Sequence, residues 1–161
     1  RIFRRRILLV AAGLALLLTP FAFDFFAREK TALEHLRSGD ALSAAGHEDE
    51  ARVAYEHALA QAPADLRAEI QHRLAQLARL SGDLPRALTL LDEVCADRSY
   101  SGRETALVER AKTLAGLDRT EEARQAYALA LREFPASVQE TEVQLRVLAD
   151  GLEGLGYGGG D

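Results

Sequence analysis

A short pattern recurs three times along the chain at a fixed spacing. An alanine returns every 36 residues, at Ala51, Ala87 and Ala123. Four positions further on stand large side chains, Tyr55, Leu91 and Tyr127. Self-similarity with a period in this range is typical of arrays in which small helical units stack on one another. The spacing therefore predicts a helical repeat protein.

The composition fits an all-α fold. Aromatic residues make up 6% of the chain, and neither Met nor Trp is present, so the core must be built mainly from Leu, Ala and Val. Ala lets helix backbones approach closely while Leu fills the remaining space. No run of β-branched residues predicts a strand. We therefore expect three helix pairs that form an all-α solenoid.

Turn and capping residues place the first helices. We expect one helix over about 29–45, ended by Gly46, and a partner helix that continues to about residue 61. Asp65 is a suitable N-cap for the next helix. Pro85 lies where the first turn of the following helix should be, and there its missing N–H costs nothing.

The later boundaries rest on spacing as well. Ser101 and Asp118 each stand three residues before a glutamate, the spacing of a capping box, so each should start a helix. A last helix over about 137–152 would cover the end of the array, as terminal repeats require. The repeat domain should thus span 28–153, and the Gly-rich tail 154–161 should be loose.

An apolar stretch precedes the repeats. Residues 7–27 carry one charge, Asp24, and as a helix they would span about 30 Å, the thickness of a hydrocarbon core. The alternative is a cleaved secretory signal. A cut after Ala22 or after Ala27 would lack a small residue three places upstream, which favours a retained membrane helix. A buried core helix is disfavoured because the stretch has no polar face.

Basic residues suggest an orientation for this helix. The flank 1–6 is rich in Arg, so the N-terminus should stay in the cytoplasm and the repeats should lie across the membrane. In a bacterium this predicts a single-pass inner-membrane protein with a periplasmic repeat domain. Ala11, Ala12 and Ala15 offer a small-residue face for packing against another membrane helix. A lipid-facing surface without a partner is the alternative.

Several function classes are disfavoured. The net charge is −5 and the basic excess is confined to the N-terminal segment, so we expect no nucleic acid partner. No two of the four histidines have the spacing that places two ligands on one helix face, so we expect no metal and no other cofactor. Catalytic motifs are absent, so we expect no enzyme. The single Cys95 should be a small core residue, with a free reactive thiol as the alternative.

The repeated residues resemble the tetratricopeptide repeat, a helix pair with small residues at its eighth and twentieth positions. The first unit has Gly39, Ala51, Tyr55, Ala58 and Pro63. The second has Ala75, Ala87, Leu91 and Val94 and lacks the proline. The third has Ala111, Ala123, Tyr127, Ala130 and Pro135. The match covers 32–135, in units of 36 residues where the family has about 34.

This resemblance implies a use. In such arrays the first helices of the pairs line a concave groove that binds extended peptides or partner helices. The matching groove positions are Asp40, Ser43, Glu69, His72, Gln76, Arg79, Val108 and Lys112. The Lys/Asn set with which some relatives clamp a C-terminal carboxylate is absent, so we do not expect capture of that kind. A solvated polar face is the alternative.

Together these observations predict a non-enzymatic, membrane-anchored scaffold or assembly factor for protein–protein interaction. It would act at the periplasmic face of a bacterial inner membrane. Its partners would be integral membrane or envelope proteins, and it would contact the lipid bilayer through 7–27. The alternative is a permanent accessory subunit of a large membrane complex, held there by its transmembrane helix.

Overall fold

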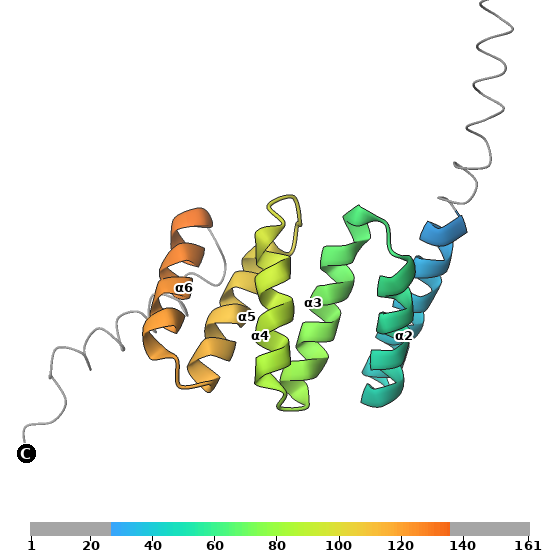
Figure 1. Ribbon diagram of the computed structural model, residues 1–161, viewed down its shortest axis with the longest axis horizontal. Helices are drawn as coiled ribbons and strands as arrows, with labels where there is room; N and C mark the ends of the chain where they lie inside the picture. Colours follow the sequence, from blue (N-terminus) through green and yellow to red (C-terminus); the bar gives the residue numbers. More distant parts are fainter. Residues whose placement is uncertain (1–26, 136–161) are drawn as a thin grey trace, which may run out of the picture. The chain divides into compact units, whose positions relative to one another are not determined.

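The regular structure of the described residues is entirely helical. The computed structural model describes residues 27–135, which divide after Ala64 into two compact units (Figure 1). The first unit holds a helix over 27–44 and α2 (Glu48–Gln61). The second holds α3 (Ala64–Leu80), α4 (Leu84–Ala96), α5 (Arg103–Gly116) and α6 (Thr120–Glu133).

Gly46 ends the first helix, as predicted. Its φ of +79° lies in the left-handed region, which glycine adopts without a steric penalty. The chain then turns back, so that His47 N donates to Leu42 O over 2.9 Å and Gly46 N donates to Ser43 O over 3.1 Å. These bonds satisfy carbonyls that the end of a helix leaves without partners.

The two helices of the first unit cross closely at Gly39. A Cβ atom on Gly39 would lie 2.5 Å from the ring of Tyr55, a contact that real structures do not tolerate. The Tyr55 ring is 2% exposed, and its hydroxyl donates to Asp40 Oδ1 over 2.7 Å, so it has little freedom to move away. The small residue at this repeat position is thus required by the aromatic side chain opposite it.

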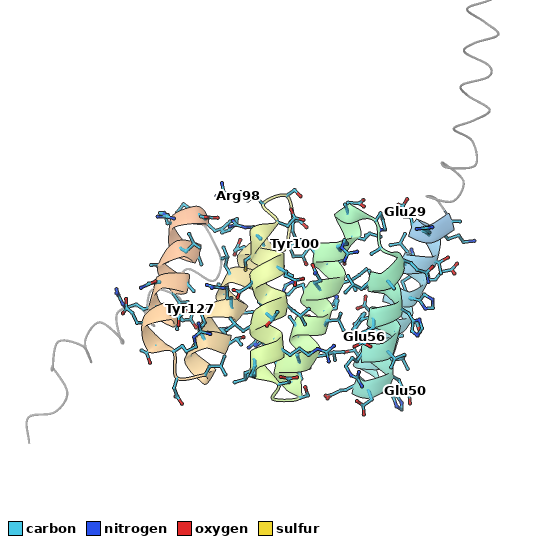
Figure 2. All side chains as sticks on the ribbon, in the orientation of Figure 1. Glu29, Glu50, Glu56, Arg98, Tyr100 and Tyr127 are labelled. Carbon is cyan, nitrogen blue, oxygen red and sulfur yellow. The ribbon has the colours of Figure 1, made fainter. Side chains whose placement is uncertain are left out.

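Equivalent positions build the core of the second unit. Ala75 and Leu91 belong to one buried cluster, and Ala111 and Tyr127 belong to another. All four side chains are at most 1% exposed. Figure 2 shows Tyr127 on α6, and α6 packs against α5 as α5 packs against α4. The same pairing of a small and a large side chain therefore recurs in each helix pair.

Charged side chains add contacts between neighbouring helices of the second unit. Arg103 at the start of α5 is 8% exposed, and its Nε donates to the carbonyl of Cys95 at the end of α4 over 2.8 Å. Its guanidinium also pairs with Glu133 at the end of α6. Asp92 of α4 pairs with Arg110 of α5. The contacts of Arg103 join helix ends, and the pair of Asp92 with Arg110 joins α4 to α5 within their lengths.

The start of α4 matches the prediction. Pro85 lies in the first turn, and Asp83 is the N-cap, with Oδ1 accepting from Arg86 N over 3.2 Å. Gly82, with a φ of +81°, makes the turn that precedes this cap.

Three predicted helix starts are wrong. Helix α3 already begins at Ala64, so Asp65 lies in its first turn instead of at the N-cap. Helix α5 follows Gly102, without a side-chain cap from Ser101. Asp118 adopts a φ of +60°, and Arg119 N donates to Leu114 O over 3.0 Å. Asp118 therefore closes α5 in the way that Gly46 closes the first helix, and it does not open α6.

Several predictions fall outside the described residues. They concern most of the membrane helix 7–27, the packing face at Ala11, Ala12 and Ala15, the covering helix over 137–152 and the tail 154–161. Within 27–135, no helix combines the length and the apolar character that crossing a bilayer would require.

The crossing at Gly39 gives a stability prediction. Gly39→Ala should lower the free energy of unfolding by about 1–2 kcal/mol, since the cost of overpacking exceeds the gain in helix propensity. Urea unfolding followed by circular dichroism measures the change. Ser38→Ala, at an exposed neighbouring position of the same helix, is the matched control and should be close to neutral. A Gly39→Ala protein as stable as the parent would contradict the close crossing.

Candidate functional site

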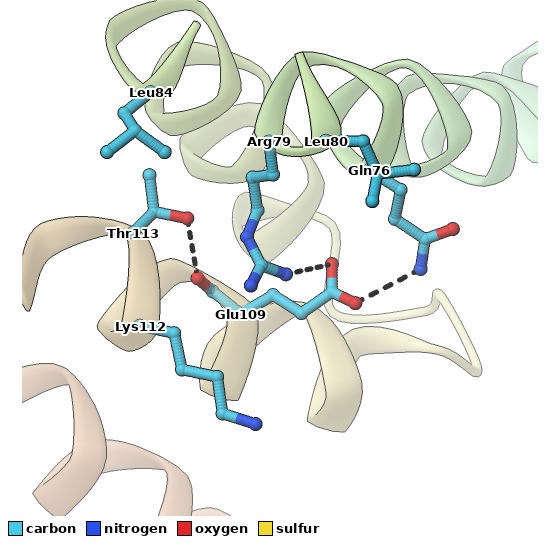
Figure 3. Close-up of a pocket in the computed structure, with 7 residues that line it drawn as sticks. All are labelled: Gln76, Arg79, Leu80, Leu84, Glu109, Lys112 and Thr113. Carbon is cyan, nitrogen blue, oxygen red and sulfur yellow. Dashed lines mark hydrogen bonds and ion pairs between the residues drawn. The ribbon is translucent and has the colours of Figure 1, made fainter. Parts of the chain in front are cut away.

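Polar side chains of α3 and α5 meet at the carboxylate of Glu109. Gln76 of α3 donates from Nε2 to Glu109 Oε1 over 3.1 Å. Arg79, one turn further along α3, places Nη1 3.6 Å from Oε2 (Figure 3). The Glu109 side chain is 15% exposed. An internal carboxylate is thus held by two side chains from the facing helix.

His72 completes this cluster from the buried side. Its Nε2 lies 3.0 Å from Glu109 Oε2, and its Nδ1 lies 2.9 Å from the hydroxyl of Tyr100 in the connection between α4 and α5. The two rings meet edge to face, with centroids 5.7 Å apart. His72 is 5% exposed. Both ring nitrogens therefore have partners, as a buried imidazole requires.

The charge of Glu109 follows from these contacts. Burial by itself would raise the pKa of Glu109, because it disfavours the ionised form. The hydrogen bonds from His72 and Gln76, together with the charges of His72 and Arg79, outweigh burial and lower this pKa below its ordinary value. The carboxylate is therefore ionised at neutral pH. Burial and the charge of Glu69 raise the pKa of the Tyr100 hydroxyl, which stays protonated there.

A pocket of about 410 Å³ opens beside Glu109 (Figure 3). Its lining comes from α3, the start of α4 and α5, and consists of Gln76, Arg79, Leu80, Leu84, Glu109, Lys112 and Thr113. Leu80 is 70% exposed, whereas the Thr113 hydroxyl donates to Glu109 O over 2.7 Å. The pocket therefore combines an apolar wall with charged and hydrogen-bonding groups.

The structure places the predicted groove residues in different environments. Gln76, Arg79 and Lys112 come together in the pocket, and His72 lies buried behind it. Glu69 lies close enough to Tyr100 for its charge to raise the pKa of the hydroxyl. Val108 is 2% exposed and packs in the core, so its side chain is not accessible to a ligand.

Two further predicted groove residues, Asp40 and Ser43, belong to the first unit. Asp40 is partly exposed and accepts the hydrogen bond from Tyr55. Ser43 is partly exposed as well, and its carbonyl takes part in the turn at Gly46.

Sequence reasoning missed Glu109, Thr113, Leu80 and Leu84. The signal for the first two was present, because Glu109 lies three residues before Lys112 and four before Thr113, which is the spacing of one helix face. The resemblance selected Val108 for this face instead, one position away from Glu109. Leu80 and Leu84 flank the turn between α3 and α4, and nothing in their spacing distinguishes pocket-lining from core positions.

Among the residues that the structure describes, no group of three or more His, Cys, Asp or Glu side chains could hold a metal ion. Cys95 is partly buried and packs against both core clusters of the second unit, in line with the prediction of a small core residue. Burial raises the pKa of its thiol from 9.0 to about 11.

Comparisons with known proteins agree with this fold. Residues 105–137 match the family model described as tetratricopeptide repeat. The structure titled first TPR of Spaghetti (RPAP3) bound to HSP90 peptide SRMEEVD is 22% identical, with a TM-score of 0.64, and the match covers 75% of this chain and 96% of that chain. The TPR domain of OM64 from Arabidopsis is 15% identical, with a TM-score of 0.65, and the match covers 76% of this chain and 98% of that chain. No curated protein matches the sequence. The predicted all-helical tetratricopeptide fold is confirmed for the described residues.

The lowered pKa of Glu109 gives a prediction for the dependence of stability on pH. A folded-state pKa below the ordinary 4.5 means that ionised Glu109 stabilises the fold above that pH, and that this stabilisation is lost as the pH falls through the folded-state value. Glu109→Gln should therefore cost about 1–2 kcal/mol at neutral pH and much less in acid.

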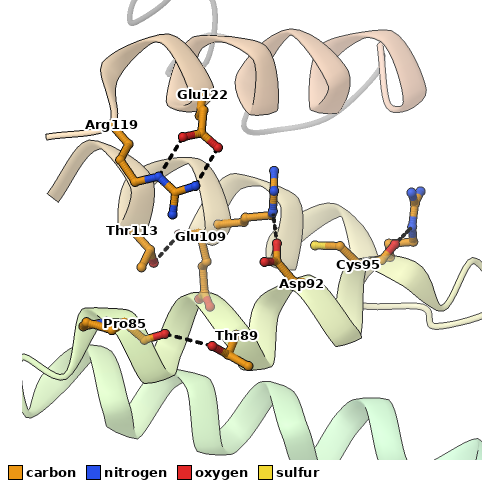
Figure 4. Close-up of polar contacts among 10 residues, drawn as sticks. Pro85, Thr89, Asp92, Cys95, Glu109, Thr113, Arg119 and Glu122 are labelled. Carbon is orange, nitrogen blue, oxygen red and sulfur yellow. Dashed lines mark hydrogen bonds and ion pairs between the residues drawn. The ribbon is translucent and has the colours of Figure 1, made fainter. Parts of the chain in front are cut away.

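Urea unfolding of the parent and of Glu109→Gln, from neutral pH down to below the ordinary carboxyl pKa, measures this difference. Glu122→Gln is the matched control, because its exposed carboxylate pairs with Arg119 outside the pocket (Figure 4). Exposed ion pairs contribute little, so the control should lose less stability. A cost for Glu109→Gln that stays constant with pH would show that its charge is not what stabilises the fold.

The raised pKa of Cys95 gives a further prediction. At pH 8 the folded protein should be alkylated by iodoacetamide about 100-fold more slowly than the chain in denaturing urea, since the thiolate is the reactive form and burial suppresses it. Mass spectrometry follows the reaction over time. Equal rates in the folded and unfolded protein would restore the alternative of a free reactive thiol.

Proposed function

We propose that this chain is a membrane-anchored scaffold or assembly factor, without enzymatic activity, that binds peptide segments of other proteins through its tetratricopeptide repeats. It would work at the periplasmic face of a bacterial inner membrane. The fold itself indicates protein–protein interaction, since helical repeats of this kind present extended surfaces to partners. Membrane attachment, location and client binding are the proposed parts.

One observation carries the binding role. The pocket between α3 and α5 has an exposed apolar wall at Leu80 and charged groups at Arg79, Lys112 and Glu109. A peptide segment offers side chains and backbone groups that match both parts. The similar domain of RPAP3 was solved with a peptide of HSP90, which supports peptide binding as a use of this fold.

The membrane part of the proposal rests on the sequence before the repeats. Residues 7–27 have the length and the apolar character of a bilayer-spanning helix, and the Arg-rich flank 1–6 favours a cytoplasmic N-terminus. A retained helix would hold the repeats close to the bilayer, where integral membrane and envelope proteins are the available partners.

The alternative is a permanent accessory subunit of a large membrane complex. The small-residue face at Ala11, Ala12 and Ala15 favours it, because small residues let membrane helices pack closely. In that case the anchor would determine the assembly, and the pocket would contribute little.

Purification of the full-length protein in mild detergent tests the proposal. Co-purifying proteins are quantified by mass spectrometry for the parent, for a pocket variant that combines Leu80→Ser with Lys112→Glu, and for Val53→Ser. Val53 is the matched control, because it is a 45% exposed apolar residue on α2. A set of substoichiometric envelope proteins should fall at least about tenfold in the pocket variant, as expected when a buried Leu contact is lost. The same set should persist in the control.

A fixed group of integral membrane proteins at constant ratio, retained by the pocket variant and lost on deletion of 1–27, would establish the accessory subunit instead. Recovery in the soluble fraction without detergent would rule out the membrane anchor.

A further inference from the structure

We propose that Glu109 acts as an internal counter-ion that makes the pocket between α3 and α5 select an uncharged peptide segment with an aliphatic side chain over an acidic segment. The inference rests on the proposed binding role of this pocket. It adds the chemical class of the ligand and the residue that determines it. Three features of the described residues lead to it.

The first feature is that the cations of the pocket already have partners. Arg79 lies 3.6 Å from Glu109 Oε2, and Lys112 also takes part in an interaction within the protein. A ligand carboxylate could bind to either cation only by competing with the existing partner. The exchange of one ion pair for another contributes little binding free energy, because the group that the ligand displaces loses its own partner.

The second feature is the charge that remains on Glu109. Its side chain is 15% exposed, and donors from α3 hold both of its oxygens, so the carboxylate stays in place and ionised. An acidic side chain that enters the pocket would face this negative charge across a space where water screens it only partly. Repulsion between like charges thus opposes an acidic ligand.

The third feature is the apolar wall. Leu80 is 70% exposed, and among the described residues only Val53 is another large hydrophobic with comparable exposure. Leu84 lines the same pocket, and Figure 3 shows Leu80 and Leu84 on either side of Arg79. A volume of about 410 Å³ accommodates an aliphatic side chain with part of its backbone. Covering Leu80 would remove its apolar surface from water.

Two hexapeptides with fluorescent labels test the selection. Each carries its fluorophore on the N-terminal amine and an amide at the C-terminus, and their sequences are Ala-Leu-Gln-Gln-Leu-Ala and Ala-Leu-Glu-Glu-Leu-Ala. Fluorescence anisotropy gives their affinities for the full-length protein in mild detergent. The parent should bind the Gln peptide more tightly. Glu109→Gln should strengthen binding of the Glu peptide about fivefold or more, because it frees Arg79 and removes the repulsion, and should change the Gln peptide little.

Three further variants separate the contributions of net charge, of Arg79 and of Leu80. Glu122→Gln removes an Arg-paired carboxylate outside the pocket, so it makes the same change in net charge and should leave both affinities unchanged. Arg79→Gln combined with Glu109→Gln should reduce the gain for the Glu peptide to the part that comes from the lost repulsion, because the freed guanidinium is then missing. Leu80→Ser should weaken the Gln peptide about tenfold.

A parent protein that prefers the Glu peptide, or a Glu109→Gln protein without a gain for it, would overturn the inference. This result is independent of the client-binding test. Partners lost from the Leu80 and Lys112 variant, with no effect of Glu109→Gln on peptide choice, would leave the proposed function standing and refute the role of Glu109. If Glu109→Gln strengthens binding of the Glu peptide but no natural partner depends on the pocket, the role of Glu109 stands and the proposed function is refuted.

Discussion

The structure depends on close crossing of paired helices, where a small side chain on one helix faces a large one on the other. At Gly39 the contact is tight enough that even a methyl group would overlap the Tyr55 ring. Ala75 with Leu91, and Ala111 with Tyr127, repeat the pairing in the second unit. A short interhelical distance leaves little room for adjustment, so the register of each pair is fixed by these positions. The fixed register of each helix pair then determines where the side chains on the other helix faces point.

The pocket is a consequence of this placement. With α3 and α5 held in fixed orientations, Gln76 and Arg79 reach Glu109 from the facing helix, and His72 supports it from the buried side. A carboxylate buried to this degree is tolerated because donors satisfy both of its oxygens. The same arrangement leaves Leu80 exposed at the rim. The proposed selectivity follows from Glu109, a charged side chain with all its hydrogen bonds made, and from Leu80, an apolar side chain open to solvent.

Sequence reasoning succeeded where a local signal had a single structural solution. Gly46 and Pro85 were assigned correctly because backbone conformation restricts what each can do. It failed at Asp118, where two signals overlapped. The capping-box spacing indicated a helix start, whereas the residue adopts a left-handed conformation that ends the preceding helix. Spacing alone does not distinguish these uses of an Asp between two helices.

The sequence by itself determined the number of helix pairs, their period and the small and large positions that let them cross, because these follow from local backbone preference and from a repeat that is visible in one chain. The tertiary structure decided which polar residues meet. Val108 and Glu109 are adjacent in sequence, yet one side chain is in the core and the other is in the pocket. Their environments differ because neighbouring side chains of a helix point about 100° apart, and only tertiary packing determines which side of the helix faces the core.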